Sequence, residues 1–343
     1  MKTFFIAEAG VNHNGDDELA LRLVETAALC GADAVKFQTF SADKLVQKGA
    51  EKAEYQKQST GEGDQYSMLK KLEMSEALHY KLLNKCADLN IEFMSTPFDE
   101  EAADFLVNIG MRHIKVPSGE LTNHPFLSFL AKKNLPLILS TGMATLSEIS
   151  DAIDIIRGVR QECGFVEPLS KMLTILHCTS NYPAAIDDVN LLAMNTIANT
   201  FQLPVGYSDH TAGIIVSIAA VAMGATVIEK HFTLDRNLPG PDQKASLEPN
   251  ELAELISRIR DVEKAFGSPV KQPNESELPI RALVRRSVTL VRNIEAGQSI
   301  TSDDVKLLRP GIGIPPMDLS KVIGRSAVKS MEAGIALQWS DLK

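Results

Sequence analysis

The chain has 343 residues, of which 44% are hydrophobic, and it carries a formal net charge of −9 with a pI of about 5.4. This acidic balance argues against a nucleic-acid partner, and it requires any anion-binding site to be locally basic. No apolar run approaches the roughly 18 residues of a membrane span, and the short run that opens the chain is too brief for a signal peptide because Glu8 interrupts it.

Short apolar runs recur along the chain and alternate with helical patterns. The runs are rich in Val, Ile, Leu and Phe, as in parallel strands buried on both faces, and they begin at Phe4, Ala34, Ile91, His113, Pro136, Leu173, Pro204 and Thr226. Helical spacing of apolar residues follows most of them, at 16–30, 75–89, 99–109, 147–158, 212–223 and 249–266. The alternation predicts an α/β fold, a (β/α)8 TIM barrel with its active site at the C-terminal ends of the strands.

Polar residues capable of chemistry stand at the ends of these predicted strands. They are Glu8, Lys36, Gln38, Thr96, Lys115, Ser118, Glu120, Ser140, Thr141, Tyr182, Ser208, His210 and His231. A purely structural role can be written for any one of them. A purely structural role for the polar residues at all eight predicted strand ends is improbable, so the pattern favours an enzyme.

Three further stretches depart from the barrel pattern. Residues 41–71 are long and polar, and we expect either a loop over the active site or a disordered surface loop. The barrel pattern stops near Gly267, so we assign residues 1–270 to the barrel, 271–284 to a polar, proline-bearing linker and 285–343 to a small second domain. That domain contains an internal echo between residues 294–306 and 331–343, which predicts a compact, loop-rich module with pseudo-symmetry.

His210 and His231 follow the seventh and eighth predicted strands, which are neighbours in a closed barrel. Two neutral imidazoles near one point can hold a divalent metal and leave positions open for substrate or water. Each histidine could instead be a hydrogen-bonded barrel residue, but the pair beside Asp209 and Glu229 favours the metal. The four cysteines lack metal-type or redox-type spacing, which is typical of reduced thiols in a cytoplasmic protein.

Two lysines, Lys36 and Lys115, lie at strand ends among hydroxyl residues and glycine turns. This grouping suits an anion such as a phosphate or carboxylate. A lysine at a barrel mouth could also form a Schiff base with a carbonyl substrate, or an interior ion pair, for example with Glu120. Glu8, Glu120 and Asp242 are candidate acids, bases or polyol-binding groups, and Arg309 could present a guanidinium to a carbonyl or carboxylate.

The ordered motifs resemble the sialic acid synthase family along nearly the whole chain. They are AEAGVNHNG at Ala7, VKFQTF at Val35, STPFD at Ser95, KVPSGE at Lys115, STGMAT at Ser140, LHCTSNYP at Leu176, SDHT at Ser208, EKHFTLDRNLPGPD at Glu229 and RPGIG at Arg309. The tail is similar to the antifreeze-like (SAF) domain of that family. The resemblance implies condensation of phosphoenolpyruvate with N-acetylmannosamine and water to give N-acetylneuraminate and phosphate, by a transferase.

The resemblance also implies roles for individual residues. His210 and His231 would hold the divalent ion, Mn²⁺ first with Mg²⁺ or Co²⁺ as alternatives, and Glu8 would contact the sugar and handle protons. The phosphoenolpyruvate site would comprise Lys36, Thr96, Lys115, Ser118, Ser140, Ser180 and Ser208. The sugar site would comprise Gln38, Glu120, Tyr182, Asp242 and Arg309, with the arginine supplied by the partner in a domain-swapped homodimer.

Two residues depart from the family pattern. Ser180 stands where some members carry Asn, which affects one contact to phosphate, and Ile312 stands where RPGNG is common, which affects the turn presenting Arg309. The sequence leaves open the same mechanism on a diacetamido-trideoxyhexose, which would give legionaminate or pseudaminate. Two readings from other classes are a Schiff-base aldolase using Lys36 or Lys115, and a non-catalytic carbohydrate-binding or ice-binding protein.

Overall fold

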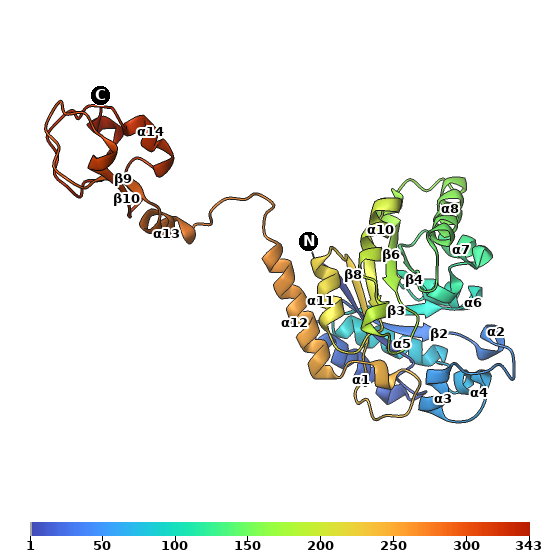
Figure 1. Ribbon diagram of the computed structural model, residues 1–343. Helices are drawn as coiled ribbons and strands as arrows, with labels where there is room; N and C mark the ends of the chain where they lie inside the picture. Colours follow the sequence, from blue (N-terminus) through green and yellow to red (C-terminus); the bar gives the residue numbers. More distant parts are fainter. Residues whose placement is uncertain (1) are drawn as a thin grey trace. The chain divides into compact units, whose positions relative to one another are not determined.

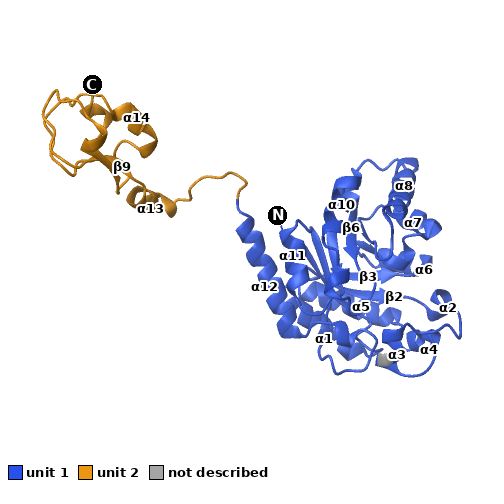
Figure 2. Ribbon diagram, viewed as in Figure 1, with its two compact units in different colours: residues 1–267 blue, residues 268–343 orange. Residues whose placement is uncertain are grey.

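The computed structural model describes residues 2–343, apart from the side chain of Gln58. The chain divides into two compact units, Met1–Gly267 and Ser268–Lys343 (Figure 2), and each is described by itself. Within the described residues, no helix combines the length and the apolar character that crossing a membrane requires.

The first unit is built on eight parallel strands surrounded by helices (Figure 1). The strands follow the order β3-β2-β1-β8-β7-β6-β5-β4, and β3 lies against β4, so the sheet closes on itself as a barrel. This confirms the predicted (β/α)8 fold. The strands are β1 (Phe4–Gly10), β2 (Ala34–Thr39), β3 (Glu92–Pro97), β4 (Ile114–Val116), β5 (Leu137–Ser140), β6 (Leu173–Cys178), β7 (Val205–Asp209) and β8 (Val227–His231).

Six of the barrel's helices occupy the segments in which the sequence predicts them. They are α1 (Asp17–Leu29), α5 (Glu76–Asp88), α6 (Glu100–Asn108), α8 (Leu146–Glu162), α11 (Ile215–Ala222) and α12 (Pro249–Phe266). Helices α7 (His124–Ala131) and α10 (Leu192–Phe201) were not predicted, and neither was the single turn α9 (Leu169–Met172). Helix α10 buries only Met194 and Ile197 among its described residues, so it carries little apolar periodicity.

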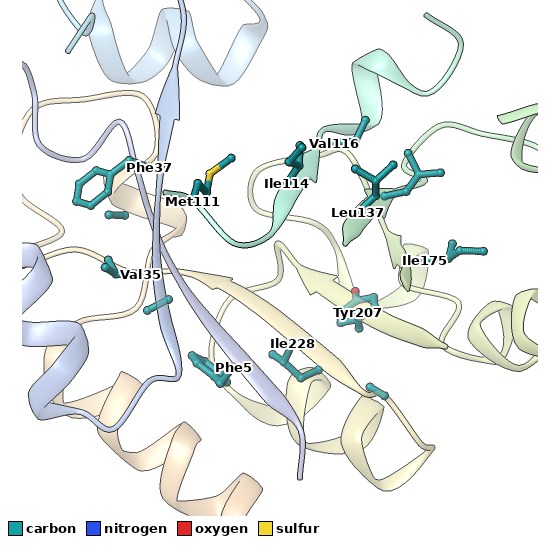
Figure 3. Packing of buried hydrophobic residues seen from close by; sticks show 14 of the residues in the cluster. Phe5, Val35, Phe37, Met111, Ile114, Val116, Leu137, Ile175, Tyr207 and Ile228 are labelled. Atoms are coloured by element: carbon teal, nitrogen blue, oxygen red, sulfur yellow. The ribbon is translucent and has the colours of Figure 1, made fainter. Parts of the chain in front are cut away.

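Strand residues alternate between two apolar layers. Phe5, Val35 and Ile228 point outward and pack against the helices (Figure 3). Residues one position away point into the barrel and form a separate inner cluster of Ile6, Ala34, Met94, Ile138, Leu176 and Val227. The inner cluster, which comes from six of the eight strands, gives the barrel a packed floor below its C-terminal mouth.

The polar segment between β2 and α5 folds into three short helices, α2 (Ala42–Leu45), α3 (Glu54–Thr60) and α4 (Gln65–Lys70). Its Phe40, Met68 and Leu72 pack with Val11 of the β1–α1 connection in a small apolar cluster. The alternative of a disordered surface loop is therefore wrong, because the segment has its own buried apolar side chains.

The second unit contains α13 (Glu277–Val284), the antiparallel pair β9 (Ser287–Leu290) and β10 (Val305–Leu308), and the short helix α14 (Leu319–Val322). Helix α13 occupies part of the stretch that the sequence assigns to a linker. The core of this unit is small and includes Val288, Ile300 and Leu337, all fully buried. Such a core fits a compact, loop-rich module.

The sequence echo appears in this unit as structural pseudo-symmetry. Ile294 and Met331 occupy equivalent positions in the echo, and they form an antiparallel bridge with each other. Both copies then end in a 3₁₀ helix, Ser302–Asp304 in one and Trp339–Asp341 in the other. The closing aspartates are also equivalent: Asp304 pairs with Arg292 at 2.5 Å, and Asp341 pairs with Lys329 at 3.1 Å. The two half-motifs thus repeat each other in both backbone and ion pairs.

Candidate active site

The strand periodicity places the polar candidates directly above the apolar floor of the barrel. Two residues beyond Ile6, Ala34 and Val227 of that floor lie Glu8, Lys36 and Glu229 on the same strands. Because side chains alternate along a strand, these residues also point into the barrel. Each is nevertheless almost completely buried, at 1%, 2% and 5% exposure. A buried layer of charges in place of a further apolar layer indicates a functional site.

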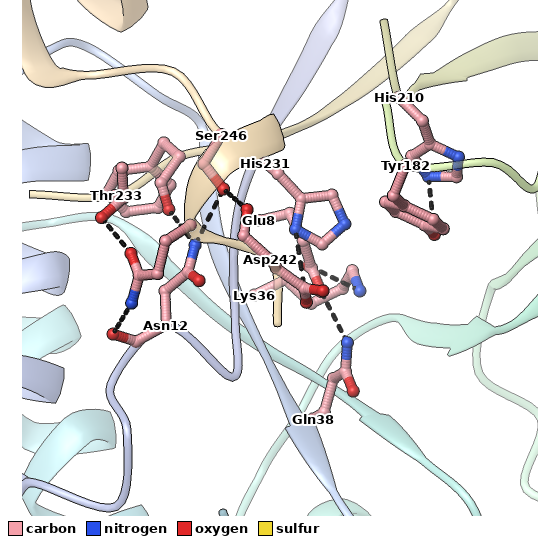
Figure 4. A network of polar contacts seen from close by, with 12 residues as sticks. Glu8, Asn12, Lys36, Gln38, Tyr182, His210, His231, Thr233, Asp242 and Ser246 are labelled. Atoms are coloured by element: carbon pink, nitrogen blue, oxygen red, sulfur yellow. Dashed lines mark hydrogen bonds and ion pairs between the residues drawn. The ribbon is translucent and has the colours of Figure 1, made fainter. Parts of the chain in front are cut away.

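A cavity of 190 Å³ opens into this layer. Its walls include most of the residues predicted from the sequence, and Figure 4 shows part of the polar network around it. The predicted residues that line it are Glu8, Lys36, Gln38, Thr96, Lys115, Ser118, Ser140, Ser180, Tyr182, Ser208, His210 and His231. Glu120 and Asp242 are not among its walls, and Arg309 belongs to the second unit.

Two lysines and two glutamates form the centre of the site. The Lys36 Nζ lies 2.6 Å from Glu8 Oε2 and 3.6 Å from Glu229 Oε2. The Lys115 Nζ lies 3.6 Å from the other oxygen of Glu229. Lys36 also donates a 2.8 Å hydrogen bond to Thr96, and Ser208 donates one of 2.9 Å to Glu229. The lysines and glutamates therefore alternate, and an anion that enters the cavity could contact both Lys36 and Lys115.

The two glutamates are held in different protonation ranges. Burial raises the pKa of Glu8 to about 7, against the opposing effect of Lys36 and with the help of the Glu229 charge. Burial also acts to raise the pKa of Glu229, but Lys115 and Lys36 outweigh it and lower that pKa to about 2. Glu8 can therefore gain or lose a proton near neutral pH, whereas Glu229 stays charged. Two carboxyl groups separated in this way suit one proton carrier and one fixed counter-charge.

The pKa values of the two lysines are also shifted in opposite directions. Burial acts to lower the pKa of Lys36, but the carboxylates of Glu229 and Glu8 outweigh it and raise that pKa. For Lys115 burial, aided by the charge of Lys36, outweighs the carboxylates of Glu229 and Glu8, and the pKa is lowered. An anionic substrate beside Lys115 would therefore favour the charged form of this lysine.

Hydroxyl groups and a glycine form the wall next to Lys115. Ser118 accepts a 2.9 Å hydrogen bond from the backbone N–H of Gly142. A Cβ atom on Gly142 would lie 2.1 Å from the Ser180 hydroxyl and 2.9 Å from that of Ser118, so a side chain there would displace both serines. The buried Ser140 hydroxyl has no hydrogen-bond partner among the described residues. This unpartnered hydroxyl, together with the neighbouring serines, fits a small polyoxygenated ligand.

The two histidines fit a metal site with two nitrogen ligands. Their ring centroids lie 5.8 Å apart, and burial lowers the pKa of both, so both imidazoles are neutral. His210 donates its Nδ1 proton to the Thr179 carbonyl at 2.7 Å, which leaves Nε2 as an acceptor that faces the hydroxyls of Tyr182 and Ser208. His231 Nδ1 is buried without a hydrogen-bond partner among the described residues. The described residues contain no cluster of three His, Cys, Asp or Glu side chains that could hold a metal ion. A substrate or water would therefore have to complete the coordination shell of an ion held by the two histidines.

Aromatic and amide groups surround the histidines. The Tyr182 hydroxyl lies 3.1 Å from His210 Nε2, and its ring lies 4.2 Å from the His210 ring. Gln38 donates a 3.5 Å hydrogen bond to Glu8. Burial raises the pKa of Asp242 to about 6, and its carboxylate lies 4.0 Å from His231 Nδ1. Glu120 instead accepts a 2.7 Å hydrogen bond from Asn123.

Glu229, Phe98 and Met143 also line the cavity, although none of the three was predicted from the sequence to belong to the site. Glu229 could have been found, because it lies two residues before His231 on one strand and so shares its face. Tyr55 of α3 was also missed. Its ring stacks on Tyr182 at 5.4 Å, a contact between distant segments that spacing along the chain does not reveal.

Comparison with known proteins connects this geometry to a family. Residues 23–271 match the NeuB family, and residues 285–343 match the SAF domain. The chain is 54% identical to the N,N'-diacetyllegionaminic acid synthase of Legionella pneumophila, across 100% of this chain and 95% of that one. It is 46% identical to the enzyme of the same name from Campylobacter jejuni, across 96% and 97% of the two chains. A crystal structure of the N-acetylneuraminic acid (sialic acid) synthetase of Leptospira borgpetersenii, in complex with citrate, superposes with a TM-score of 0.71 at 35% identity, covering 82% of this chain and 90% of that one.

Proposed function

The chain belongs to the NeuB family, and from this premise we propose that it condenses phosphoenolpyruvate with a 2,4-diacetamido-2,4,6-trideoxyhexose and water to give N,N'-diacetyllegionaminate and phosphate. The observation that carries the choice of sugar is the 54% identity, along the whole chain, to an enzyme named for that product. The sequence alone placed N-acetylneuraminate first and legionaminate second, and the relatives favour the second over the first.

The site residues support binding of the two substrates at different ends of the cavity. Phosphoenolpyruvate would lie against Lys36, Lys115 and the hydroxyls of Thr96, Ser118, Ser140, Ser180 and Ser208, which together offer charge and hydrogen bonds to its phosphate and carboxylate. The open-chain sugar would lie toward Gln38, Tyr182 and Asp242. This order brings C3 of phosphoenolpyruvate towards the sugar aldehyde.

Bond formation then proceeds without a covalent enzyme intermediate. The C3 carbon of phosphoenolpyruvate attacks C1 of the aldehyde, and positive charge develops at C2. Water adds at C2, and cleavage of the C2–O bond of the resulting tetrahedral adduct releases phosphate. Glu8 is placed to transfer protons, since its pKa of about 7 permits both gain and loss at neutral pH. The two lysines, held in place by the Glu229 carboxylate, stabilise the negative charge of the departing phosphate.

A divalent metal ion, Mn²⁺ first and Mg²⁺ or Co²⁺ as alternatives, would be held by His210 and His231 and would polarise the aldehyde carbonyl. The second unit would act on a neighbouring copy in a domain-swapped homodimer, with Arg309 directed to an acetamido group of the sugar. Arg309 is exposed, and no ion pair engages it among the described residues, so its guanidinium is available.

The test is phosphate release from phosphoenolpyruvate in the presence of Mn²⁺, with the diacetamido-trideoxyhexose compared with N-acetylmannosamine. Preference for the diacetamido sugar is the expected result. Preference for N-acetylmannosamine would move the enzyme to N-acetylneuraminate, and no release with either sugar would contradict the synthase. Borohydride treatment with pyruvate should leave no adduct on Lys36 or Lys115, and an adduct would favour the aldolase.

A further inference from the structure

The insertion between β2 and α5 is fixed in place by contacts that do not involve its tyrosine Tyr55. Lys52, which is buried, donates hydrogen bonds of 3.1 and 3.3 Å to the carbonyls of Gly61 and Glu62 at the end of α3. Asp64 caps the start of α4 and also accepts a 2.8 Å hydrogen bond from the Gly49 N–H. These polar contacts, together with the apolar cluster around Met68, position α3 independently of Tyr55.

Tyr55 extends from α3 toward the sugar side of the site. Its ring stacks on Tyr182 with an angle of 30° between the planes, and Tyr182 in turn contacts His210. Burial raises the pKa of Tyr55 to about 12, and the carboxylate of Asp242 adds to this shift, so Asp242 is close to the same ring. Tyr55 is therefore the direct neighbour of Tyr182, which lines the cavity beside His210.

The remaining contacts of Tyr55 contribute little to the stability of the fold. Its hydroxyl accepts a 3.3 Å hydrogen bond from the adjacent Gln56 amide, and its ring remains partly exposed. A partly exposed aromatic face beside a polar site offers an apolar contact to C–H groups of a ligand.

We propose that Tyr55 is a specificity-determining residue, whose ring forms with Tyr182 the apolar wall against which the methyl groups of the acceptor sugar pack. This inference rests on the proposed function and deepens it. A 2,4-diacetamido-2,4,6-trideoxyhexose carries a C6 methyl and a second acetamido methyl where N-acetylmannosamine carries hydroxyl groups. An aromatic wall favours the first sugar because burying its methyl groups against the rings gains free energy that the hydroxyls of the second sugar do not supply.

The experiment compares wild type, Tyr55→Ser and Tyr55→Phe by the ratio of kcat/KM for the diacetamido sugar to kcat/KM for N-acetylmannosamine. Loss of the ring in Tyr55→Ser should lower this ratio about 10-fold, the discrimination expected for one or two apolar groups in a pocket. Tyr55→Phe should keep the ratio because it keeps the ring. The KM for phosphoenolpyruvate should stay unchanged in both, since Tyr55 lies outside the lysine and serine wall.

Tyr66→Ser is the matched control, since Tyr66 lies in the same insertion but its hydroxyl donates to Asp43 at 2.8 Å and its ring lies beneath Lys48. It should leave the ratio at the wild-type value. If Tyr55→Ser does not fold, Tyr55→Gln takes its place, because glutamine keeps side-chain volume but replaces the apolar ring with a polar amide. An unchanged ratio in the Tyr55 variant, or an equal change in Tyr66→Ser, would overturn the inference.

The two proposals fail in different ways. Absence of phosphate release by wild type with any sugar would contradict the proposed reaction. An active wild type whose ratio does not respond to Tyr55→Ser would overturn only the role of Tyr55. A wild type that prefers N-acetylmannosamine would contradict the proposed sugar, and the response of the ratio to Tyr55→Ser would still decide whether Tyr55 sets specificity.

Discussion

Asp209 and Lys230 are direct cross-strand partners on β7 and β8, and their side chains form a buried ion pair of 3.0 Å. Their exposures are 1% and 0%. Each immediately precedes one of the two site histidines, His210 and His231. Because neighbouring side chains point to opposite faces of the sheet, the ion pair lies behind the barrel wall while the histidines face the cavity. The pair thus fixes the lateral spacing of the two histidines from outside the site.

Lys230→Met should destabilise the barrel by about 3 kcal/mol, because it leaves the Asp209 carboxylate buried without its cation. Asp209 would keep its hydrogen bonds from Thr211 and Ser217, so the loss stays below that of an isolated charge. Urea unfolding followed by circular dichroism measures the change. Lys264→Met, which removes a cation from an exposed pair with Asp261, is the control and should have no measurable effect. Equal stability of wild type and Lys230→Met would show that the pair does not hold the strands.

His13 should make the protein sensitive to mild acid. Its side chain is fully buried, it accepts a 3.0 Å hydrogen bond from the Gly15 N–H, and burial lowers its pKa from 6.5 to about 4. Between these values the unfolded chain binds a proton that the folded chain does not, so stability is complete above pH 6.5 and is lost as the pH falls toward 4.

Between pH 6.5 and pH 5, this group alone should account for about 2 kcal/mol of lost unfolding free energy. His13→Gln should flatten that part of the pH profile, while His124→Gln, at a partly exposed position, should not. Identical pH profiles for wild type and His13→Gln would contradict a neutral, buried His13.

Lys115→Met should weaken phosphoenolpyruvate binding more than sugar binding. The change removes a cation 3.6 Å from Glu229 and leaves that carboxylate facing the anionic substrate. Loss of one charge-stabilising group typically costs about 100-fold in kcat/KM, and here we expect it to appear in the KM for phosphoenolpyruvate. Steady-state kinetics with each substrate varied in turn separates the two effects. A selective rise in the KM for the sugar would contradict the prediction, because it would mean that Lys115 binds the sugar and not phosphoenolpyruvate.

Metal binding should depend on His231. Calorimetric titration with Mn²⁺ should detect one site in wild type and none in His231→Gln, because one imidazole alone is a weak ligand. His177→Gln, whose imidazole instead donates to the Val189 carbonyl at 2.8 Å, should bind as wild type does. A chelator should abolish phosphate release, and Mn²⁺ should restore it. Unaltered Mn²⁺ binding by His231→Gln would exclude this histidine as a ligand.

The strand alternation made much of this site predictable from the sequence. Once Glu8, Lys36 and His231 are placed at the ends of buried parallel strands, the period of two directs them into the barrel, and closure brings them together. The same rule, applied one step further, would have found Glu229. Helix α10 was missed for the opposite reason, since its described residues bury too few apolar side chains to produce a clear period.

The contribution of the insertion could not be predicted, because its contacts are not local. Tyr55 meets Tyr182 only after residues 41–71 fold against the barrel, and no period along the chain relates the two tyrosines. Asp242 and Glu120 show the same limit, since both follow strands but lie on connections whose course depends on tertiary packing. Residues on strands inherit their direction from the sheet, whereas residues on connections do not.

Arg309 provides the test of exchange between subunits. Arg309→Ala should raise the KM for the sugar, since it removes a donor to an acetamido group, and should leave the KM for phosphoenolpyruvate unchanged. If the arginine acts on the partner's barrel, mixing the inactive His231→Gln variant with Arg309→Ala should form hybrid dimers. In such a hybrid, one barrel combines an intact histidine pair with an intact arginine from the other chain. Activity of the mixture above the sum of its components, after subunit exchange, is the expected result. Strict additivity of a mixture in which hybrids are detected by mass would mean that each chain's arginine serves its own barrel.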